Sequence, residues 1–403
     1  MSSTLSKENR VVSGMRPTGS MHLGHYHGVL RNWVELQFEY ECFFFVADWH
    51  ALTTHYDDPS NIQTHITEMV IDWLAVGINP ASATVFLQSD IVEHAELHLL
   101  LSMITPLGWL ERVPSYKDQQ EKLKERDLAT YGFLGYPLLQ SADILLYNAS
   151  YVPVGEDQVA HVEMTREVAR RFNHLYGRED DFEKKAIRAL KLLGDSNRDS
   201  YVAARKSYQE KGKAEALQAG RSIVLGSPRL TVADRDRLLG YLEGTGRTIL
   251  MEPDALLTPM PKVPGLDGQK MSKSYGNTIG LREDPKAIEK KLRTMPTDPA
   301  RIRRTDPGDP DKCPVWEFHK IYSGAETRDW VTEGCRSAGI GCVECKGPVI
   351  EAVLKELEPI RERALPYVEN PNAIKAILNE GRERARDSAR DTIDDVREVM
   401  GLE

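Results

Sequence analysis

The sequence lacks the features that mark membrane and secreted proteins. It has no apolar run long enough to cross a bilayer, and residues 1–9 have neither the basic nor the apolar segment of a signal peptide. Cysteine is scarce, with five in 403 residues, which excludes a disulfide-stabilised fold. We therefore expect a cytoplasmic protein, whose 41% hydrophobic residues suffice for a large core and two or three domains.

Positive charge is also in deficit. The 61 acidic residues outnumber the 52 basic ones and leave a formal net charge of -9. This excess of negative charge argues against a protein that binds nucleic acid over its whole surface. A nucleic-acid partner would have to be bound through local basic patches, such as Arg301, Arg303 and Arg304 or Arg382, Arg384 and Arg386.

Short apolar segments alternate with helical patterns in the first half of the chain. Residues 11–15, 42–47 and 84–88 read as buried strands, and residues 61–76 read as a helix. Such alternation predicts an α/β fold with a Rossmann-type doubly wound parallel sheet, whose ligands bind beyond the carboxyl ends of the strands. Apolar residues at helical spacing near the end of the chain predict a C-terminal helical domain.

The loop of residues 264–277 carries two lysines, Lys270 and Lys273, with Met271, Ser272 and Ser274 around them. Lysine is a compact charge on a flexible stem, so two of them could follow a triphosphate as charge moves onto its leaving group. A solvated basic turn is the alternative for an isolated pair of lysines.

A second loop, from Arg16 to His25, lies between the first predicted strand and a helix. Gly24 would let a nucleotide approach the backbone, and the free amides of the helix N-terminus favour phosphate. His22 and His25 are candidate donors to phosphate oxygens, with the Thr18 hydroxyl in reach. A structural role is the alternative for a lone histidine pair.

Asp143 is a single carboxylate in the apolar segment 136–147. Burying a carboxylate is costly unless donors pair it, so Asp143 is either held by nearby groups or reserved for a ligand donor. His50 follows the second predicted strand and would lie at the same sheet edge. It would contact substrate or pack in the core.

These segments together resemble the bacterial tryptophanyl-tRNA synthetases. Residues 270–274 spell the KMSKS signature of class I aminoacyl-tRNA synthetases, and His22-Leu23-Gly24-His25 stands where its partner signature is expected. Five blocks are similar to the tryptophan enzymes in order: 13–28, 45–58, 86–97, 136–172 and 264–277. Tyrosyl-tRNA synthetase shares both signatures, and a non-aminoacylating, metal-bearing RNA-binding or regulatory paralogue is a further alternative.

The resemblance implies a two-step reaction. Tryptophan attacks the α-phosphate of Mg-ATP, and the activated acyl group then passes to tRNA(Trp), in a homodimer. His22, His25, Lys270 and Lys273 would be catalytic. The implied ATP-binding residues are Arg16, Thr18, Gly24, Gly155, Asp157, Lys270, Met271, Ser272, Lys273 and Ser274; Asp157 could instead cap the following helix.

The same resemblance implies that tryptophan contacts Tyr136, Gln140, Asp143, Gln158 and His50. Asp143 would accept the indole N–H, because that group is a donor and a carboxylate is an acceptor. An analogue without the N–H would then be rejected by roughly 10⁴-fold. Many relatives differ at His25, Gln140 and Val12, where they carry asparagine, methionine and an aromatic residue.

The resemblance also divides the chain. Residues 1–178 and 251–290 would form the catalytic domain, and residues 291–403 a helical anticodon-binding domain. The charged insertion 179–250 interrupts the family pattern; it has no ligand cluster, and only residues 185–193 and 232–242 read as helical.

Four of the five cysteines crowd into residues 313–345. Only Cys342 and Cys345 form a CxxC pair, whereas structural zinc sites commonly combine two such pairs, although zinc would accept four thiolates. Four unrelated thiols are the remaining alternative. Since a subset of the family carries a [4Fe-4S] cluster at similar spacing, the resemblance implies that cluster, held by Cys313, Cys335, Cys342 and Cys345.

Overall fold

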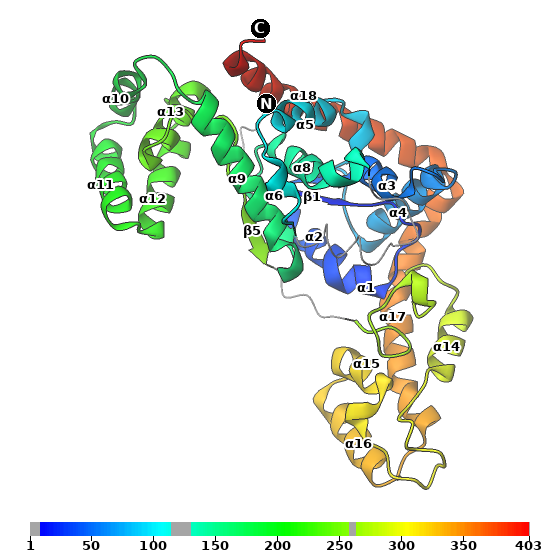
Figure 1. The fold of residues 1–403 in the computed structure, drawn as a ribbon. Helices are drawn as coiled ribbons and strands as arrows, with labels where there is room; N and C mark the ends of the chain where they lie inside the picture. Colours follow the sequence, from blue (N-terminus) through cyan, green and yellow to red (C-terminus); the bar gives the residue numbers. More distant parts are fainter. Residues whose placement is uncertain (1–8, 114–129, 258–262, 403) are drawn as a thin grey trace.

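The structure is a computed structural model that describes residues 9–113, 130–257 and 263–402 (Figure 1). Its centre is a five-stranded sheet in the order β3-β2-β1-β4-β5, in which every pairing is parallel. The predicted α/β class is therefore confirmed. The strands are β1 (Arg10–Met15), β2 (Glu41–Val46), β3 (Ala83–Leu87), β4 (Tyr151–Val154) and β5 (Asp254–Leu257).

Alternate side chains of the central strands enter two different cores. Cys42, Phe44 and Val46 of β2 point into one, and Phe43 and Phe45 point into the other. A strand buried on both faces reads as a continuous apolar run, which is how this segment looks in the sequence. Cys42 is buried in the first core.

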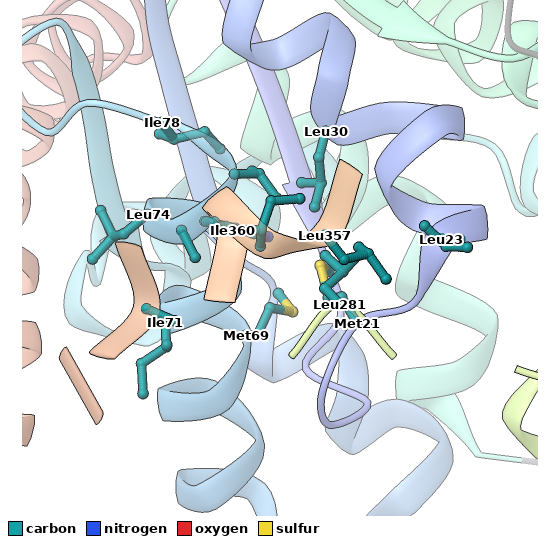
Figure 2. Close-up of a cluster of buried hydrophobic side chains, with 14 of the residues drawn as sticks. Met21, Leu23, Leu30, Met69, Ile71, Leu74, Ile78, Leu281, Leu357 and Ile360 are labelled. Carbon is teal, nitrogen blue, oxygen red and sulfur yellow. The ribbon is translucent and has the colours of Figure 1, made fainter. Parts of the chain in front are cut away.

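The first core lies beneath α2 (Arg31–Leu36), α4 (Ile62–Val76) and α17 (Cys342–Glu369). Figure 2 shows Leu357 and Ile360 of α17 beside Met21, Leu23 and Leu281. Helix α17 therefore joins the C-terminal region to the segment that carries the histidine pair. The shorter helices α14 (Pro285–Thr294), α15 (Pro314–Tyr322) and α16 (Ala325–Arg336) lie along the same part of the chain.

The second core is covered by α5 (Glu93–Ser102), α8 (Tyr131–Leu145), α9 (Val159–Tyr176) and part of α18 (Pro371–Met400). Helix α18 packs on β3, where a Cβ at Gly381 would lie 1.8 Å from the Val85 carbonyl oxygen. Arg384 donates to the carbonyl of Pro80, and Arg386 approaches Glu93. These two arginines, named as candidates for nucleic-acid contacts, tie α18 to the loop before β3 and to α5.

The insertion forms four helices around its own core, which includes Leu190, Tyr201, Val224 and Leu238. The two predicted helical segments match α10 (Phe182–Leu192), with one residue beyond its end, and α13 (Val232–Glu243). The predictions missed α11 (Asp195–Lys211) and α12 (Ala214–Leu225), because most of their residues face solvent and weaken the apolar period. The insertion stands to one side of the sheet (Figure 1).

The first predicted helix is interrupted. Helix α1 (Leu23–His25) passes into a π-helical turn, η2 (Tyr26–Leu30), before α2 begins. Short π segments are frequent at functional sites. In the described parts of the chain no helix is long and apolar enough to cross a membrane. The remaining short elements are α3 (Asp48–His55), η3 (Gln88–Asp90), α6 (Leu107–Leu110), η4 (Glu156–Gln158), η5 (Lys273–Tyr275) and η6 (Pro310–Lys312).

Candidate functional site

Backbone pairing brings the histidine pair and the lysine loop together. His22 forms an antiparallel bridge with Gly280, just after the loop. The Leu23 amide donates to Ile279 O at 3.0 Å, and the Leu281 amide donates to Met21 O at 3.0 Å. Two segments more than half the chain apart therefore form one site, which we call the phosphate half.

A buried carboxylate fixes this junction. Asp72 on α4 is fully buried and accepts from the Met21 amide at 2.6 Å and from Arg282 Nε at 2.5 Å. Burial raises the pKa of Asp72 despite the Arg282 charge. Sequence reasoning missed both residues, because nothing local in the sequence connects α4 with the chain beyond the lysine loop.

His22 and His25 lie ring against ring, with centroids 3.8 Å apart. Burial, and then the charge of Lys273, lowers the pKa of His22 to about 4. Burial, then His22 and the two lysines, lowers the pKa of His25 to about 3. Both rings are therefore neutral at pH 7. The Nδ1 of His25 accepts from the His22 amide at 3.4 Å, which leaves its Nε2–H free to donate.

Lys273 reaches the other loop, where its Nζ donates to Thr18 O at 2.7 Å. Burial lowers the pKa of Lys273. The Gly19 backbone beside it has φ +92°, a conformation that glycine adopts without strain. Lys270, Lys273 and Thr18 are exposed at residue level, so a ligand can reach them.

The Asn277 side chain holds the lysine loop in shape through hydrogen bonds to its backbone. It is buried, its Oδ1 accepts from the Ser272 amide at 2.8 Å, and its Nδ2 donates to Lys270 O at 3.2 Å. Met271 is also buried and anchors the loop in the first core. No role was predicted for Asn277. The side chain of Ser274 lies outside the described residues.

Asp143, on α8, is the centre of a second cluster, the indole half. It is 1% exposed and accepts from His50 Nε2 at 2.8 Å, from His94 Nδ1 at 2.7 Å, and from Gln88 Nε2 at 2.8 and 3.0 Å. Although burial opposes ionisation, the hydrogen bonds from His50 and His94 hold the pKa of Asp143 well below its usual range. Asp143 is thus a paired anion, and its partners Gln88 and His94 were not predicted.

Of the other residues assigned to tryptophan or nucleoside, Tyr136 lies beside this cluster. Tyr136 is buried, with its ring 6.5 Å from that of His50. Gly155 and Gln158 follow β4, at the same edge of the sheet as the histidine loop that follows β1. Arg16 on that loop interacts electrostatically with Tyr136. Gln140 is half-buried, and the side chain of Asp157 lies outside the described residues.

His27 connects the phosphate half to the C-terminal helices. Its Nε2 lies 3.0 Å from both the Tyr322 hydroxyl on α15 and a Glu356 oxygen on α17. Tyr322 also donates to Glu356 at 2.8 Å. The groups that bind Asp143 come instead from α3, η3 and α5, so this joint belongs to the phosphate half.

The four clustered cysteines are all free thiols and lie close together. Burial, then Cys313, Cys335 and Cys342, raises the pKa of Cys345 to about 12. A Cβ at Gly308 would lie 2.7 Å from Cys335 Sγ, so only glycine leaves room there. Over the residues that the structure describes, however, no group of three or more His, Cys, Asp or Glu side chains is arranged to hold a metal ion.

Arg301, predicted to face nucleic acid, is buried beside these cysteines. It donates to Ile340 O at 2.6 Å and to Arg304 O at 3.0 Å, and its Nη1 lies 3.9 Å from Cys335 Sγ. Its guanidinium therefore stabilises the cysteine region from within.

Comparisons with known proteins agree with this geometry. The chain matches the family model for tRNA synthetases class I (W and Y) over residues 4–199 and 237–358. It is 64% identical over 393 residues to the tryptophan–tRNA ligase of Ralstonia nicotianae, covering 98% of each chain. It is 42% identical over 395 residues to that of Thermotoga maritima, covering 98% of this chain and 99% of that one.

Solved structures give the same picture. The tryptophanyl-tRNA synthetase of Campylobacter jejuni, complexed with ADP and tryptophan, has a TM-score of 0.72 at 27% identity and covers 97% of this chain and 99% of that one. A tyrosyl-tRNA synthetase from Archaeoglobus fulgidus, at TM-score 0.53 and 19% identity, shares the fold alone, covering 89% of this chain and 91% of that one.

Proposed function

The chain belongs to the class I tRNA synthetases of the tryptophan and tyrosine group, and we infer that it ligates tryptophan to tRNA. The observation that carries this conclusion is the 64% identity to a tryptophan–tRNA ligase over 98% of both chains. Tyrosine is disfavoured as the substrate, because the relatives at 64% and 42% identity over 98% of this chain are tryptophan–tRNA ligases. The enzyme would act in the cytoplasm, where tRNA is charged.

In the first step the tryptophan carboxylate would attack the α-phosphate of Mg-ATP and expel pyrophosphate. The neutral Nε2–H of His25 and the ammonium groups of Lys270 and Lys273 support stabilisation of the charge that develops on the phosphates. Because neutral histidines bind phosphate only through hydrogen bonds, the lysines would supply the positive charge. We assign Arg16, Thr18, Gly24, Gly155 and Asp157 to the ATP site on the resemblance.

ATP–pyrophosphate exchange tests the activation step. We expect exchange that depends on tryptophan and that tyrosine does not support. Exchange with tyrosine, or none with any amino acid, would overturn this function, and the second outcome would favour a non-aminoacylating RNA-binding protein.

For amino-acid recognition, we propose that Asp143 accepts the indole N–H and that Tyr136, Gln140, Gln158 and His50 line the pocket. The support is chemical: Asp143 is an ionised acceptor held inside an apolar helix, close to Tyr136 and His50. The indole nitrogen carries a hydrogen and has no lone pair free to accept, so it can act only as a donor.

We propose that Cys313, Cys335, Cys342 and Cys345 hold a [4Fe-4S] cluster. Their proximity and the glycine at position 308 support a shared centre, and the thiols would have to rotate toward one another to hold it. The cluster would stiffen the turns between α15, α16 and α17. Anaerobically purified protein should be brown and contain iron and acid-labile sulfide, and Cys345→Ser should bleach it. Colourless protein with one zinc would overturn iron in favour of zinc, and absence of any metal would overturn the shared centre.

We also propose that the C-terminal helices bind the anticodon end of tRNA(Trp), and that the protein is a homodimer. Large apolar side chains are exposed on and directly beside α5, on α6 and at the start of α8, as a covered surface would require. They are Val92, Leu99, Met103, Leu107 and Tyr131, each more than half exposed. Sedimentation at micromolar concentration should give a dimer, and a monomer would refute it.

A further inference from the structure

A buried hydrogen-bonded chain lies behind Asp143. His94 Nδ1 lies 2.7 Å from Asp143 Oδ1, and His94 Nε2 lies 2.8 Å from the Tyr147 hydroxyl. His94 and Tyr147 are both 0% exposed. Because these side chains are closed to solvent, no water competes for the hydrogen bonds between Asp143, His94 and Tyr147.

The chemistry of these groups fixes the direction of each bond. An ionised carboxylate can only accept, so His94 must carry a proton on Nδ1. Burial raises the pKa of Tyr147 well above its usual value, so the phenol keeps its proton and can donate to His94 Nε2. With the phenol as donor to Nε2, Tyr147 holds His94 in the tautomer that points its Nδ1–H at Asp143.

The two histidines on Asp143 differ in how firmly they are held. His94 is bonded through both ring nitrogens and its side chain is 0% exposed. The side chain of His50 is 10% exposed, and its Nε2 takes one position on Oδ2. Gln88 and the two histidines together take the roughly four acceptor positions of a carboxylate. An arriving N–H must therefore replace one of these donors.

We propose that His94, held by Tyr147, is a positioning residue that keeps Asp143 fixed for the indole N–H, and that His50 is the donor which the indole displaces. This proposal rests on the proposed recognition of tryptophan by Asp143. It also changes the expected selectivity. An analogue without the N–H leaves His50 in place, so Asp143 is not left unpaired, and discrimination falls from roughly 10⁴-fold toward about 10²-fold.

The test compares tryptophan with 3-benzothienylalanine, in which sulfur replaces the indole N–H, by ATP–pyrophosphate exchange. Tyr147→Phe should lower kcat/KM for tryptophan by about 10-fold, which is roughly the loss of one buried hydrogen bond. It should leave kcat/KM for the analogue within about twofold. His50→Ala should act in the opposite direction and raise the preference for tryptophan, because the analogue would then leave Asp143 with an empty position.

Tyr201→Phe is the matched control. Tyr201 is another fully buried tyrosine, whose hydroxyl donates to Leu238 O in the insertion core. Its loss should lower stability without changing the ratio of the two substrates. Should Tyr147→Phe fail to fold, His94→Gln provides the same comparison.

Equal losses for both substrates in Tyr147→Phe or His94→Gln would show a structural role only and overturn the positioning. A lowered preference for tryptophan in His50→Ala would overturn the displacement. Failure of the proposed recognition itself looks different: the wild-type protein would then activate both substrates equally well.

Discussion

The two halves of the site use the same residue type in opposite electrostatic surroundings. In the phosphate half, His22 and His25 stack on each other beside Lys270 and Lys273. In the indole half, His50 and His94 both hold Asp143. One half offers donors and positive charge that await an anion, whereas the other already contains its anion and has paired it.

Because of this difference, we expect the phosphate half to set the rate of the reaction and the indole half to set the choice of amino acid. Unmatched positive charge can stabilise the charge that appears on phosphate in the transition state, and so should act on kcat. A paired carboxylate gains nothing from charge and can only exchange one donor for another, which favours a ligand with a matching N–H. The buried carboxylate of the phosphate half, Asp72, is paired with Arg282 and leaves the charge of the two lysines unmatched.

The largest effect is expected when the paired anion is removed. Asp143→Asn turns one acceptor oxygen into a donor that faces His50, His94 or Gln88. We expect a loss of about 10³- to 10⁴-fold in kcat/KM for tryptophan and of about 3–5 kcal/mol in the free energy of unfolding. ATP–pyrophosphate exchange kinetics measure the loss in kcat/KM, and urea denaturation measures the loss in the free energy of unfolding.

Asp72→Asn is the matched control, since Asp72 is an equally buried carboxylate in the phosphate half. It should destabilise the protein and weaken the use of ATP while leaving KM for tryptophan within about twofold. Wild-type kcat/KM for tryptophan in Asp143→Asn would contradict the assigned role.

Removal of charge from the phosphate half should act on the rate. Lys273→Ala takes away an ammonium group that bridges the two loops through Thr18 O. We expect kcat to fall by about 10²- to 10³-fold, with KM for tryptophan almost unchanged. Lys286→Ala, which removes an exposed lysine on α14, should behave as wild type. Equal losses in kcat and in tryptophan affinity for Lys273→Ala would break the contrast between the halves.

The sequence was sufficient for the first three strands and for both signatures, because these depend on local patterns. The strand predictions at 11–15, 42–47 and 84–88 match β1, β2 and β3 to within one residue. The loop of Arg16 to His25 and the lysine loop could be matched to one reaction before their contact was known.

The residues that support the site could not be found in the same way. Asp72 acts through Arg282, and His94 acts through Asp143, so each depends on a partner far along the chain. A buried aspartate or histidine in an amphipathic helix carries no local sign of such a partner. The same reason explains the arginines: Arg301 and Arg384 look like surface charge in sequence, and only the fold shows that backbone carbonyls bind them.

A smaller effect is expected at the joint of His27, Tyr322 and Glu356. Glu356→Ala removes the acceptor shared by His27 and Tyr322 on α15 and α17. We expect a loss of about 1–3 kcal/mol in stability and a several-fold rise in KM for ATP. KM for tryptophan should not change, because this joint meets only the phosphate half. Glu358→Ala, an exposed neighbour on α17, is the control. An equal rise in both KM values for Glu356→Ala would contradict this separation.

The smallest effect should appear in the pH dependence of stability, where the two halves respond over different ranges. The pKa of His25 is lowered to about 3, against about 6.5 for a free histidine. Between these values the unfolded chain binds a proton that the native ring does not, so stability falls as pH is lowered from about 6.5. Asp143, whose native pKa is also lowered, contributes stability above about pH 3.9, which is lost only below that value.

His25→Asn should therefore flatten the fall in the urea midpoint between pH 6.5 and 4.5, and leave its value at pH 7.5 nearly unchanged. His55→Asn, which removes an exposed histidine at the end of α3, is the control and should keep the wild-type slope. A His25→Asn slope as steep as that of the wild type would mean that the ring is protonated in the native state. The phosphate half would then carry a third positive charge, and His25 would meet ATP as a cation and not as a neutral donor.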